Sequence, residues 1–511
     1  MSNTICSSNI TSGFIDLATY DELEKYMYGC GDAVAYFVRT TCKSTWFTQV
    51  PVILSNASGQ AEFGRTWSVS ISRAGDYLLQ TWLRIGLPEV RALNGGQDAR
   101  FHIRWTRNFM HNLIQDCCIT FNDLVAARFD NHHLDFWAAF TVPASKQVAY
   151  DNMIGNTAAL TGGSSNWLPA RLNNSDGAAP QELANDLQSD RTWLNLPLPF
   201  FYSRDSGVAL PTAALPYNEM RINFQFRNWW ELLVVEDTQA AAALNAAYRV
   251  QTSQVPGNQL ATTPGVPSLL GYVQVWANYA IVSNDERKRM ACAPRDILIE
   301  QAQMANAQTV TPSSVRSPSI DLRLSHAIKV LFFAVKNVTH ASEHSTYTVG
   351  SPEMGLLENN LTKFSGQYQL DPVDRVSLVY ENTNRLGQMG ADYFTMVNPY
   401  FHAPSVPVVN GYHSYSYSLD FICLDPMGST NYGKLTNVSI MPEFTGLARG
   451  ANGANGTVQT TLLPLGFNVQ PVPGNPNGSG VQRRQSYMFV LTCVNNNIIR
   501  ISGGALGFPV L

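Results

Sequence analysis

The chain has 511 residues, of which 45 % are hydrophobic and only 14 % are charged, and its formal net charge is −4. At about 150 residues per domain, this length predicts roughly three domains or two large ones. The charge balance excludes a basic nucleic-acid coat, which needs clustered lysine and arginine, and an acidic disordered tail. Asparagine, glutamine, serine and threonine replace the missing charges, which suits faces that become buried against neighbours. A neutral secreted or binding domain would have the same composition.

A short amphipathic helix is predicted near the amino terminus, over residues 20–28. Thr19 to Glu22 have the pattern of a capping box, and Gly29 supplies a stop. The apolar side chains that recur at helical spacing are Tyr20, Leu23, Tyr26 and Met27. The first residues lack the basic and apolar regions of a secretory signal. The most apolar runs are about half the ~20 residues that a membrane helix needs, so we expect a soluble chain made in the cytosol.

Alternation of apolar and polar residues, the pattern of strands with one buried face, dominates the rest of the chain. In 221–227 it places Ile222, Phe224 and Phe226 on one side of a strand. In 411–421 the residues expected to share one face are His413, Tyr415, Tyr417, Leu419 and Phe421. Strands spread over the whole length favour an all-β architecture of sandwiches or jelly rolls over a parallel α/β sheet.

Few helices interrupt these strands, and one of them divides the chain. We expect a helix over 121–141 and another over 284–293, the latter with Ser283 as its N-cap and its acidic residues at the amino end. No close repeat of residues is visible, but two strand-rich blocks of similar size are. The predicted organisation is an amino-terminal arm, a first jelly roll, a linker helix and a second jelly roll, with bounds 1–30, 31–283, 284–296 and 297–511.

Three long stretches rich in Gly, Pro, Ala and Asn show little periodicity: 155–190, 237–270 and 441–485. Loops of this length are usually surface features with a function, or mobile.

The motifs of common enzymes and metal sites are missing from the sequence. There is no phosphate-binding glycine loop, no H-E-x-x-H and no nucleophile elbow. The densest set of possible metal ligands lies between Asp130 and Asp135, but His132 and His133 would point about 100° apart on a helix. We therefore expect structural histidines at a packed helix. The eight cysteines include no C-x-x-C and are expected to be free core thiols, among them the adjacent Cys117 and Cys118.

Several segments, in the same order as in the family, resemble iridovirus major capsid proteins. In the first half they include FGRTWSVSISRAGDYLLQTWLRI, FNDLVAARFDNHHLDFWAAFTVP and the L-P-Y-N-E signature, whose residues are Leu215, Pro216, Tyr217, Asn218 and Glu219. In the second half they include DLRLSHAIKVLFFAVKNVTH, LVYENTNRLGQMGADYF and VNNNIIRISGGALGFPVL. The match runs from residue 9 to 511, and the three long loops seen above are its main departures.

The resemblance implies a double jelly roll, that is, two consecutive eight-stranded jelly rolls with a short amino-terminal helix and a few linker helices. It implies a homotrimer with a roughly hexagonal outline that tiles the icosahedral outer capsid of a large DNA virus. Expected partners are further copies, minor capsid proteins and the internal viral membrane, with no genome contact, no cofactor and no catalysis. The helix face formed by Tyr20, Leu23, Tyr26 and Met27 is expected to point inward, or else to pack under its own jelly roll. The long loops are expected on the outer surface of the capsid. Synthesis and assembly are expected to take place in the host cytoplasm.

A carbohydrate-binding or cupin-like protein is the alternative, since jelly rolls serve both purposes. A cupin needs clustered histidine and glutamate ligands on neighbouring strands, which the sequence does not offer.

Overall fold

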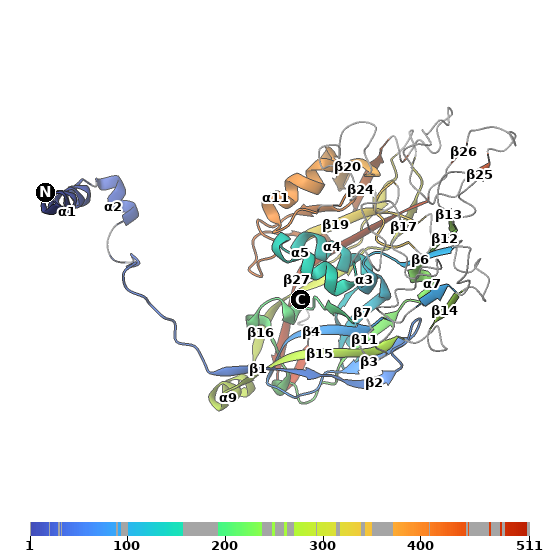
Figure 1. Ribbon diagram of the computed structural model, residues 1–511, viewed down its shortest axis with the longest axis horizontal. Coiled ribbons are helices and arrows are strands. Elements are labelled where there is room, and N and C mark those ends of the chain that lie inside the picture. The colour runs from blue at the N-terminus through green and yellow to red at the C-terminus, as the bar shows by residue number, and fades with distance from the viewer. Residues whose placement is uncertain are drawn as a thin grey trace. The chain divides into compact units, whose positions relative to one another are not determined.

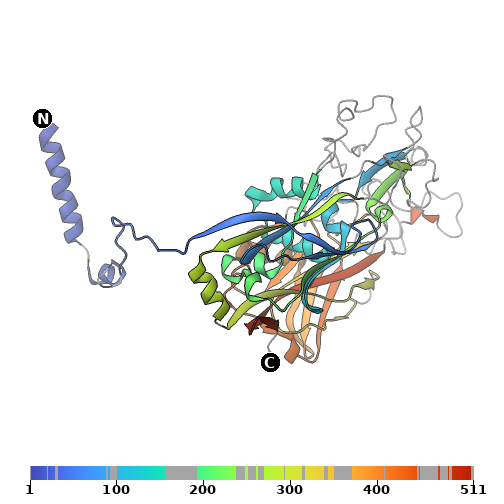
Figure 2. The ribbon, with the colours of Figure 1, turned by 90° about the horizontal axis from the view of Figure 1, so that it is seen from below.

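The computed structural model divides into two units, Met1–Trp46 and Phe47–Leu511, which are described separately (Figures 1 and 2). The residues that it describes are 2–19, 21–28, 31, 33–87, 90–92, 101–156, 193–237, 248–250, 260–262, 270–292, 294–312, 317–338, 343–349, 371–407, 409–445, 448, 470–471, 481–482 and 486–507. The long loops predicted over 155–190, 237–270 and 441–485 lie largely outside these residues. No helix of the described part is long and apolar enough to cross a membrane.

The first unit contains two helices, α1 (Ser2–Ala18) and α2 (Glu22–Tyr28). Helix α2 confirms the helix predicted over 20–28, whereas α1 was not predicted. The cap differs from the prediction: the side chain of Asp21, not that of Thr19, accepts hydrogen bonds from the backbone at the start of α2. Tyr20 lies outside the described residues.

The second unit begins with a β-sandwich of two antiparallel sheets. One sheet has the order β1 (Phe47–Ile53), β15 (Gly271–Val282), β4 (Tyr77–Gly86), with β9 (Trp193–Pro197) and β10 (Leu210–Pro211) both paired to β4. The other has the order β2 (Ser55–Gly59), β3 (Thr66–Ser70), β11 (Met220–Phe226), β7 (Ile114–Phe121), β8 (Leu124–Phe129). The alternation predicted in 221–227 is confirmed, because Ile222, Phe224 and Phe226 are buried in the core between these sheets.

A second β-sandwich follows with the same strand order. Its first sheet runs β16 (Arg295–Met304), β27 (Tyr487–Ser502), β19 (Ala327–Asn337), β22 (His413–Ser416), with β17 (Gln308–Val310), β23 (Thr430–Asn431) and β28 (Ala505–Gly507) added at the sides. Its other sheet runs β18 (Ile320–Asp321), β24 (Val438–Phe444), β20 (Val373–Tyr380), β21 (Thr383–Gly390). Shorter ladders elsewhere in the described chain join β5 (Val90–Ala92), β6 (Phe101–Trp105), β12 (Leu233–Asp237), β13 (Tyr248–Val250), β14 (Leu260–Thr262), β25 (Gln470–Pro471) and β26 (Val481–Gln482).

The two sandwiches show no repeat of residues, but they repeat the same backbone hydrogen bond at equivalent hairpins. Hairpin β7–β8 turns through Asn122 and the next residue, and β20–β21 turns through Glu381 and the next residue, all four with positive φ. The backbone N–H of Asn122 donates to Glu219 O, and that of Glu381 donates to Asn437 O, each at 2.9 Å. Glu219 and Asn437 directly precede the corresponding strands β11 and β24. The two sandwiches are therefore copies of one architecture, a double jelly roll.

Helices follow each of these hairpins. After β8 come α4 (Asn131–Thr141) and α5 (Ala144–Ile154), and after β21 come η7 (Tyr393–Val397) and α11 (Asn398–His402). The helix predicted over 121–141 is thus too long, because the positive-φ turn at Asn122 makes a hairpin of its first nine residues. Helix α5 was not predicted. Helix α9 (Asn284–Cys292) confirms the predicted linker helix. The remaining short helices among the described residues are α3 (Phe109–Leu113), α7 (Trp229–Leu232), η1 (Phe201–Ser203), η2 (Ser206–Val208), η3 (Thr212–Ala214) and η8 (Tyr432–Lys434).

The face predicted over 411–421 is partly wrong. His413, Tyr415 and Phe421 are buried, but Leu419 is 73 % exposed. Strand β22 ends at Ser416, so the alternation no longer applies to Leu419. All four residues of β22 are buried, since its sheet is covered on both faces.

Candidate functional site between the two sandwiches

Helix α4 of the first sandwich packs on the outer face of the β19–β27 sheet of the second (Figure 1). Phe136 and Phe140 are fully buried there, and the ring of Phe140 stacks on Phe332 with 5.2 Å between centroids. The residues of β19 and β27 that meet the helix are Val330, Phe332, Ala334, Val490 and Val494. This cluster is a third hydrophobic core, separate from the cores inside the sandwiches.

A buried carboxylate lies beside this core. Asp135 Oδ1 is 2.7 Å from His111 Nδ1 and accepts from Asn108 Nδ2 at 3.0 Å. Its Oδ2 accepts from Ser345 Oγ at 2.6 Å and from Tyr347 OH at 2.9 Å. Burial alone would raise the pKa of Asp135, but the hydrogen bonds from His111 and Ser345 hold this pKa below its ordinary value. Donors from both sandwiches therefore stabilise one charge.

The neighbouring histidines are structural, as the sequence predicted. His132 Nδ1 lies 3.0 Å from Tyr347 OH, while His133 stacks on Trp137 and lies 3.5 Å from Thr492 Oγ1. Burial lowers the pKa of His132 to about 3 and that of His133 to about 4. Within the described ranges, no three His, Cys, Asp or Glu side chains are grouped so that they could hold a metal.

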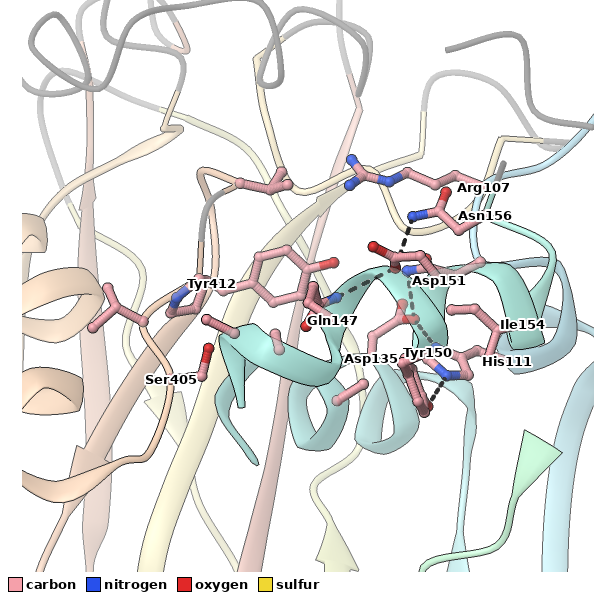
Figure 3. Close-up of a pocket in the computed structure, with 17 residues that line it drawn as sticks. Arg107, His111, Asp135, Gln147, Tyr150, Asp151, Ile154, Asn156, Ser405 and Tyr412 are labelled. Atoms are coloured by element: carbon pink, nitrogen blue, oxygen red, sulfur yellow. Dashed lines mark hydrogen bonds and ion pairs between the residues drawn. The ribbon is translucent and has the colours of Figure 1, made fainter. Parts of the chain in front are cut away.

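A cavity of about 440 Å³ opens between helices α4 and α5 and residues 405–407 and 409–412 of the second sandwich (Figure 3). His111, Asp135 and Tyr150 line it. With Nδ1–H of His111 donating to Asp135, its Nε2 accepts from Tyr150 OH at 2.7 Å. Both ring nitrogens are thus engaged, so His111 positions Asp135 and has no free nitrogen for proton transfer to a molecule in the cavity.

A second contact between the sandwiches is ionic. Arg204, from the loop after β9, donates to Glu300 Oε2 on β16 at 2.8 Å and to Ile422 O at 3.0 Å. The ammonium of Lys329 on β19 donates to the other oxygen of Glu300. The guanidinium of Arg204 also lies over the ring of Trp137, 4.4 Å from its centroid. Both Glu300 oxygens are therefore satisfied, which a buried carboxylate requires.

The L-P-Y-N-E residues form a loop that contacts both Arg73 of the first sandwich and the hairpin at the carboxyl end of the chain. The guanidinium of Arg73 donates to the carbonyls of Leu215, Pro216 and Asn218 at 2.7–3.2 Å. The side chain of Asn218 accepts from the backbone N–H of Leu506, on β28 at the carboxyl end. Leu215 and Asn218 are buried, whereas Tyr217 is 75 % exposed.

Glu219, Pro216 and Tyr217 make the other contacts of the signature loop. The backbone N–H of Glu219 donates to Asn122 Oδ1, and its carboxylate pairs with Arg221. A Cβ added at Gly504 would lie about 3 Å from the side chains of Pro216 and Tyr217. The signature is therefore a structural motif that fixes the β27–β28 hairpin against the first sandwich.

Sequence reasoning identified the segment 130–135 and the signature loop, but not their partners. Arg73 is 142 residues from Leu215, and Ser345 is 210 residues from Asp135. No local spacing connects such pairs.

Two family models match consecutive parts of the chain: "Major capsid protein N-terminus" at residues 35–282 and "Large eukaryotic DNA virus major capsid protein" at residues 286–507. The major capsid protein of Costelytra zealandica iridescent virus is 56 % identical over 508 residues, covering 99 % of this chain and 100 % of that protein. The chain belongs to the iridovirus major capsid proteins. That of Invertebrate iridescent virus 6 is 54 % identical, with 99 % and 100 % coverage.

Solved capsid structures share the fold of this major capsid protein. The PBCV-1 virus capsid model gives a TM-score of 0.65 at 19 % identity, covering 93 % of this chain and 100 % of that chain. The Faustovirus major capsid protein gives 0.58 at 10 % identity, covering 98 % and 99 %. These likenesses agree with the double jelly roll, and the family membership confirms the predicted resemblance.

The buried histidines predict a loss of stability in acid. Between about pH 6.5 and pH 4 the unfolded chain binds protons on His132 and His133 that the folded chain does not, so stability falls as the pH falls. Asp130 opposes this change, because burial raises its pKa to about 6 and the folded chain is protonated there first. His133→Gln is expected to reduce the pH dependence of the unfolding free energy by about 3 kcal/mol between pH 7 and 4, measured by denaturant unfolding. If the unfolding free energy of His133→Gln depended on pH as strongly as that of the wild-type chain, this prediction would be contradicted.

The signature loop predicts a local effect for Arg73→Ala. Loss of the bonds to three carbonyls is expected to cost about 1–2 kcal/mol and to speed amide exchange at Leu506. Arg65→Ala is the matched control, because the exposed Arg65 pairs with the partly buried Glu62 at the surface, a contact worth about 1 kcal/mol or less. Equal exchange at Leu506 in both variants would refute the role assigned to Arg73. Hydrogen exchange read by mass spectrometry measures it.

Proposed function

We propose that three copies of this major capsid protein associate into a capsomer with a roughly hexagonal outline, and that capsomers tile the icosahedral outer shell. The observation that carries this proposal is the duplicated sandwich within one chain, because three copies then supply six similar units around a ring. A hexagonal outline tiles a flat facet, and sheet edges can be hidden between units.

The proposed division of labour follows the chain. Residues 31–283 and 297–511 would each supply one jelly roll, 284–296 the linker and 1–30 the arm. Family membership at 56 % identity supports a role in the virion capsid. Interfaces of obligate assemblies bury roughly 2,000–5,000 Å², on the order of tens of kcal/mol at about 25 cal/mol/Å² of apolar area, before the cost of association. The low content of charged residues reduces the desolvation cost of such burial.

The arm is proposed to serve contacts on the inner side of the shell. Leu23, Tyr26 and Met27 on α2 are 79 %, 93 % and 71 % exposed. Apolar side chains so exposed are typical of a surface that awaits a partner. The partners proposed are minor capsid proteins or the internal membrane layer. We further propose that the chain is synthesised and assembled in the host cytoplasm. The proposal includes no contact with the genome, no cofactor and no catalysis.

Light scattering of the purified chain tests the capsomer. The expected result is a stable species near three times 56.4 kDa. A monomer that binds sugar or metal would instead favour the carbohydrate-binding or cupin-like alternative. A dimer or a tetramer would contradict the hexagonal outline.

Hydrogen exchange tests the arm. In free capsomers the amides of α2 are expected to exchange quickly, and in assembled particles they are expected to be protected by the contacts of Leu23, Tyr26 and Met27. Leu23→Ser should lower that protection. Protection of α2 that is equal in free capsomers and particles would mean that the helix packs under its own jelly roll.

A further inference from the structure

Within one chain, α4 of the first sandwich packs on the β19–β27 sheet of the second, but the equivalent helix and sheet surfaces do not contact each other. Helix α4 follows hairpin β7–β8, and η7–α11 follows the corresponding hairpin β20–β21. Figure 1 shows α3, α4 and α5 between the strands of the two sandwiches, while α11 lies at the edge of the ribbon. The helices of the first sandwich thus cover a sheet of the second, but in the second sandwich Tyr400 and Phe401 on α11 remain exposed.

The exposed counterpart of α4 is an apolar surface that we name the Phe401 patch. Its members and their exposed fractions are Met396 37 %, Val397 42 %, Tyr400 73 %, Phe401 71 %, Leu419 73 % and Met427 38 %. The patch is continuous, because His402 Nδ1 lies 2.8 Å from Leu419 O, and the N–H of Leu419 donates to Met427 O. It combines the helix with the loop that corresponds to the one carrying Arg204.

The exposed counterpart of the β19–β27 face is a row that we name the Trp82 face. Cross-strand neighbours along it are Ile53, Trp276, Trp82 and Pro197. The indoles of Trp82 and Trp276 stack with 6.1 Å between centroids, and both residues are half-buried. Ile53 is 46 % exposed. The β-bulge after Leu78 in β4 matches the one after Ile328 in β19, so Trp82 is the equivalent of Phe332, which lies under α4 in the second sandwich.

We propose that the Phe401 patch of one copy covers the Trp82 face of a second copy, repeating between chains the helix-on-sheet contact that α4 makes within the chain. The inference rests on the proposed capsomer and names the surfaces that would join its copies. The two surfaces differ, so the contact is heterologous and closes into a ring when each of three copies uses both.

Opposite charges on the two surfaces support a second copy of the chain as the partner of the Phe401 patch. Asp420 and Asp425, both exposed, follow Leu419 in the loop of the patch. On the Trp82 face, the guanidinium of Arg84 lies 4.5 Å from the ring centroid of Trp193, and its Nε has no acceptor among the described residues. A carboxylate from the patch loop would pair with this guanidinium, as Glu300 pairs with Arg204 within the chain.

Two variants and their mixture test the proposal. Phe401→Glu removes the patch but leaves the Trp82 face, while Trp82→Glu removes the face but leaves the patch. Ile53→Glu, on the edge strand β1, is a second face variant in case the Trp82 substitution unfolds the chain. Val148→Glu is the matched control, because Val148 lies on α5 and is 74 % exposed. Circular dichroism establishes that each variant folds, and light scattering gives its mass.

The expected result is that each face or patch variant alone is a monomer, with association at least 10-fold weaker than in the wild-type chain. An equimolar mixture of a patch variant and a face variant should form a dimer, because one productive junction remains between them. Val148→Glu should stay trimeric. Trimers from both variants, a mixture that stays monomeric, or equal loss in Val148→Glu would overturn the assignment. A wild-type chain that is itself not trimeric would instead refute the proposed capsomer.

Discussion

The packing of α4 on the outer face of the β19–β27 sheet is the contact on which the rest of the second unit depends. An isolated sandwich needs one buried face per sheet, yet ten of the eleven residues of β19 are buried. Phe136 and Phe140 supply the cover for Phe332, so the outer face becomes core. Without the first sandwich, the second would expose an apolar sheet face large enough to drive aggregation. The two halves are therefore one folded body.

The polar groups beside this core determine how the two halves fit together. A buried carboxylate costs several kcal/mol unless every oxygen is bonded. Asp135 meets that condition only when Ser345 and Tyr347 of the second sandwich reach it. Glu300 likewise needs Arg204 from the first sandwich and Lys329 from its own. A shift of one sandwich against the other would leave one oxygen of each carboxylate without its partner. Apolar packing thus provides the stability, and these carboxylates select the orientation.

Local sequence patterns predict those elements whose environment is local. Strand β11 has one buried face, so the alternation of its residues predicted it. The charged linker helix α9 was also predicted from its own residues. Strand β19 is buried on both faces, so its run of apolar residues carries no alternation. The helix predicted over 121–141 was too long, because the hairpin before α4 depends on the φ value of Asn122, which an apolar pattern does not report. The sites depend on partners more than 100 residues away, such as Arg73 with Leu215, and no spacing in the sequence encodes them.

The two equivalent sheet faces differ in composition, and the difference matches what each must do. The face under α4 is formed by Val330, Phe332 and Val494, which suits a contact made once, during folding, and never opened. The Trp82 face combines indole rings with Arg84 and Gln274, so it can meet water before assembly and still bury aromatic area afterwards. Tryptophan and arginine are the residues enriched where separately folded partners meet. In the proposed capsomer, divergence between two copies of one sandwich thus separates the contact that folds the chain from the contact that joins chains.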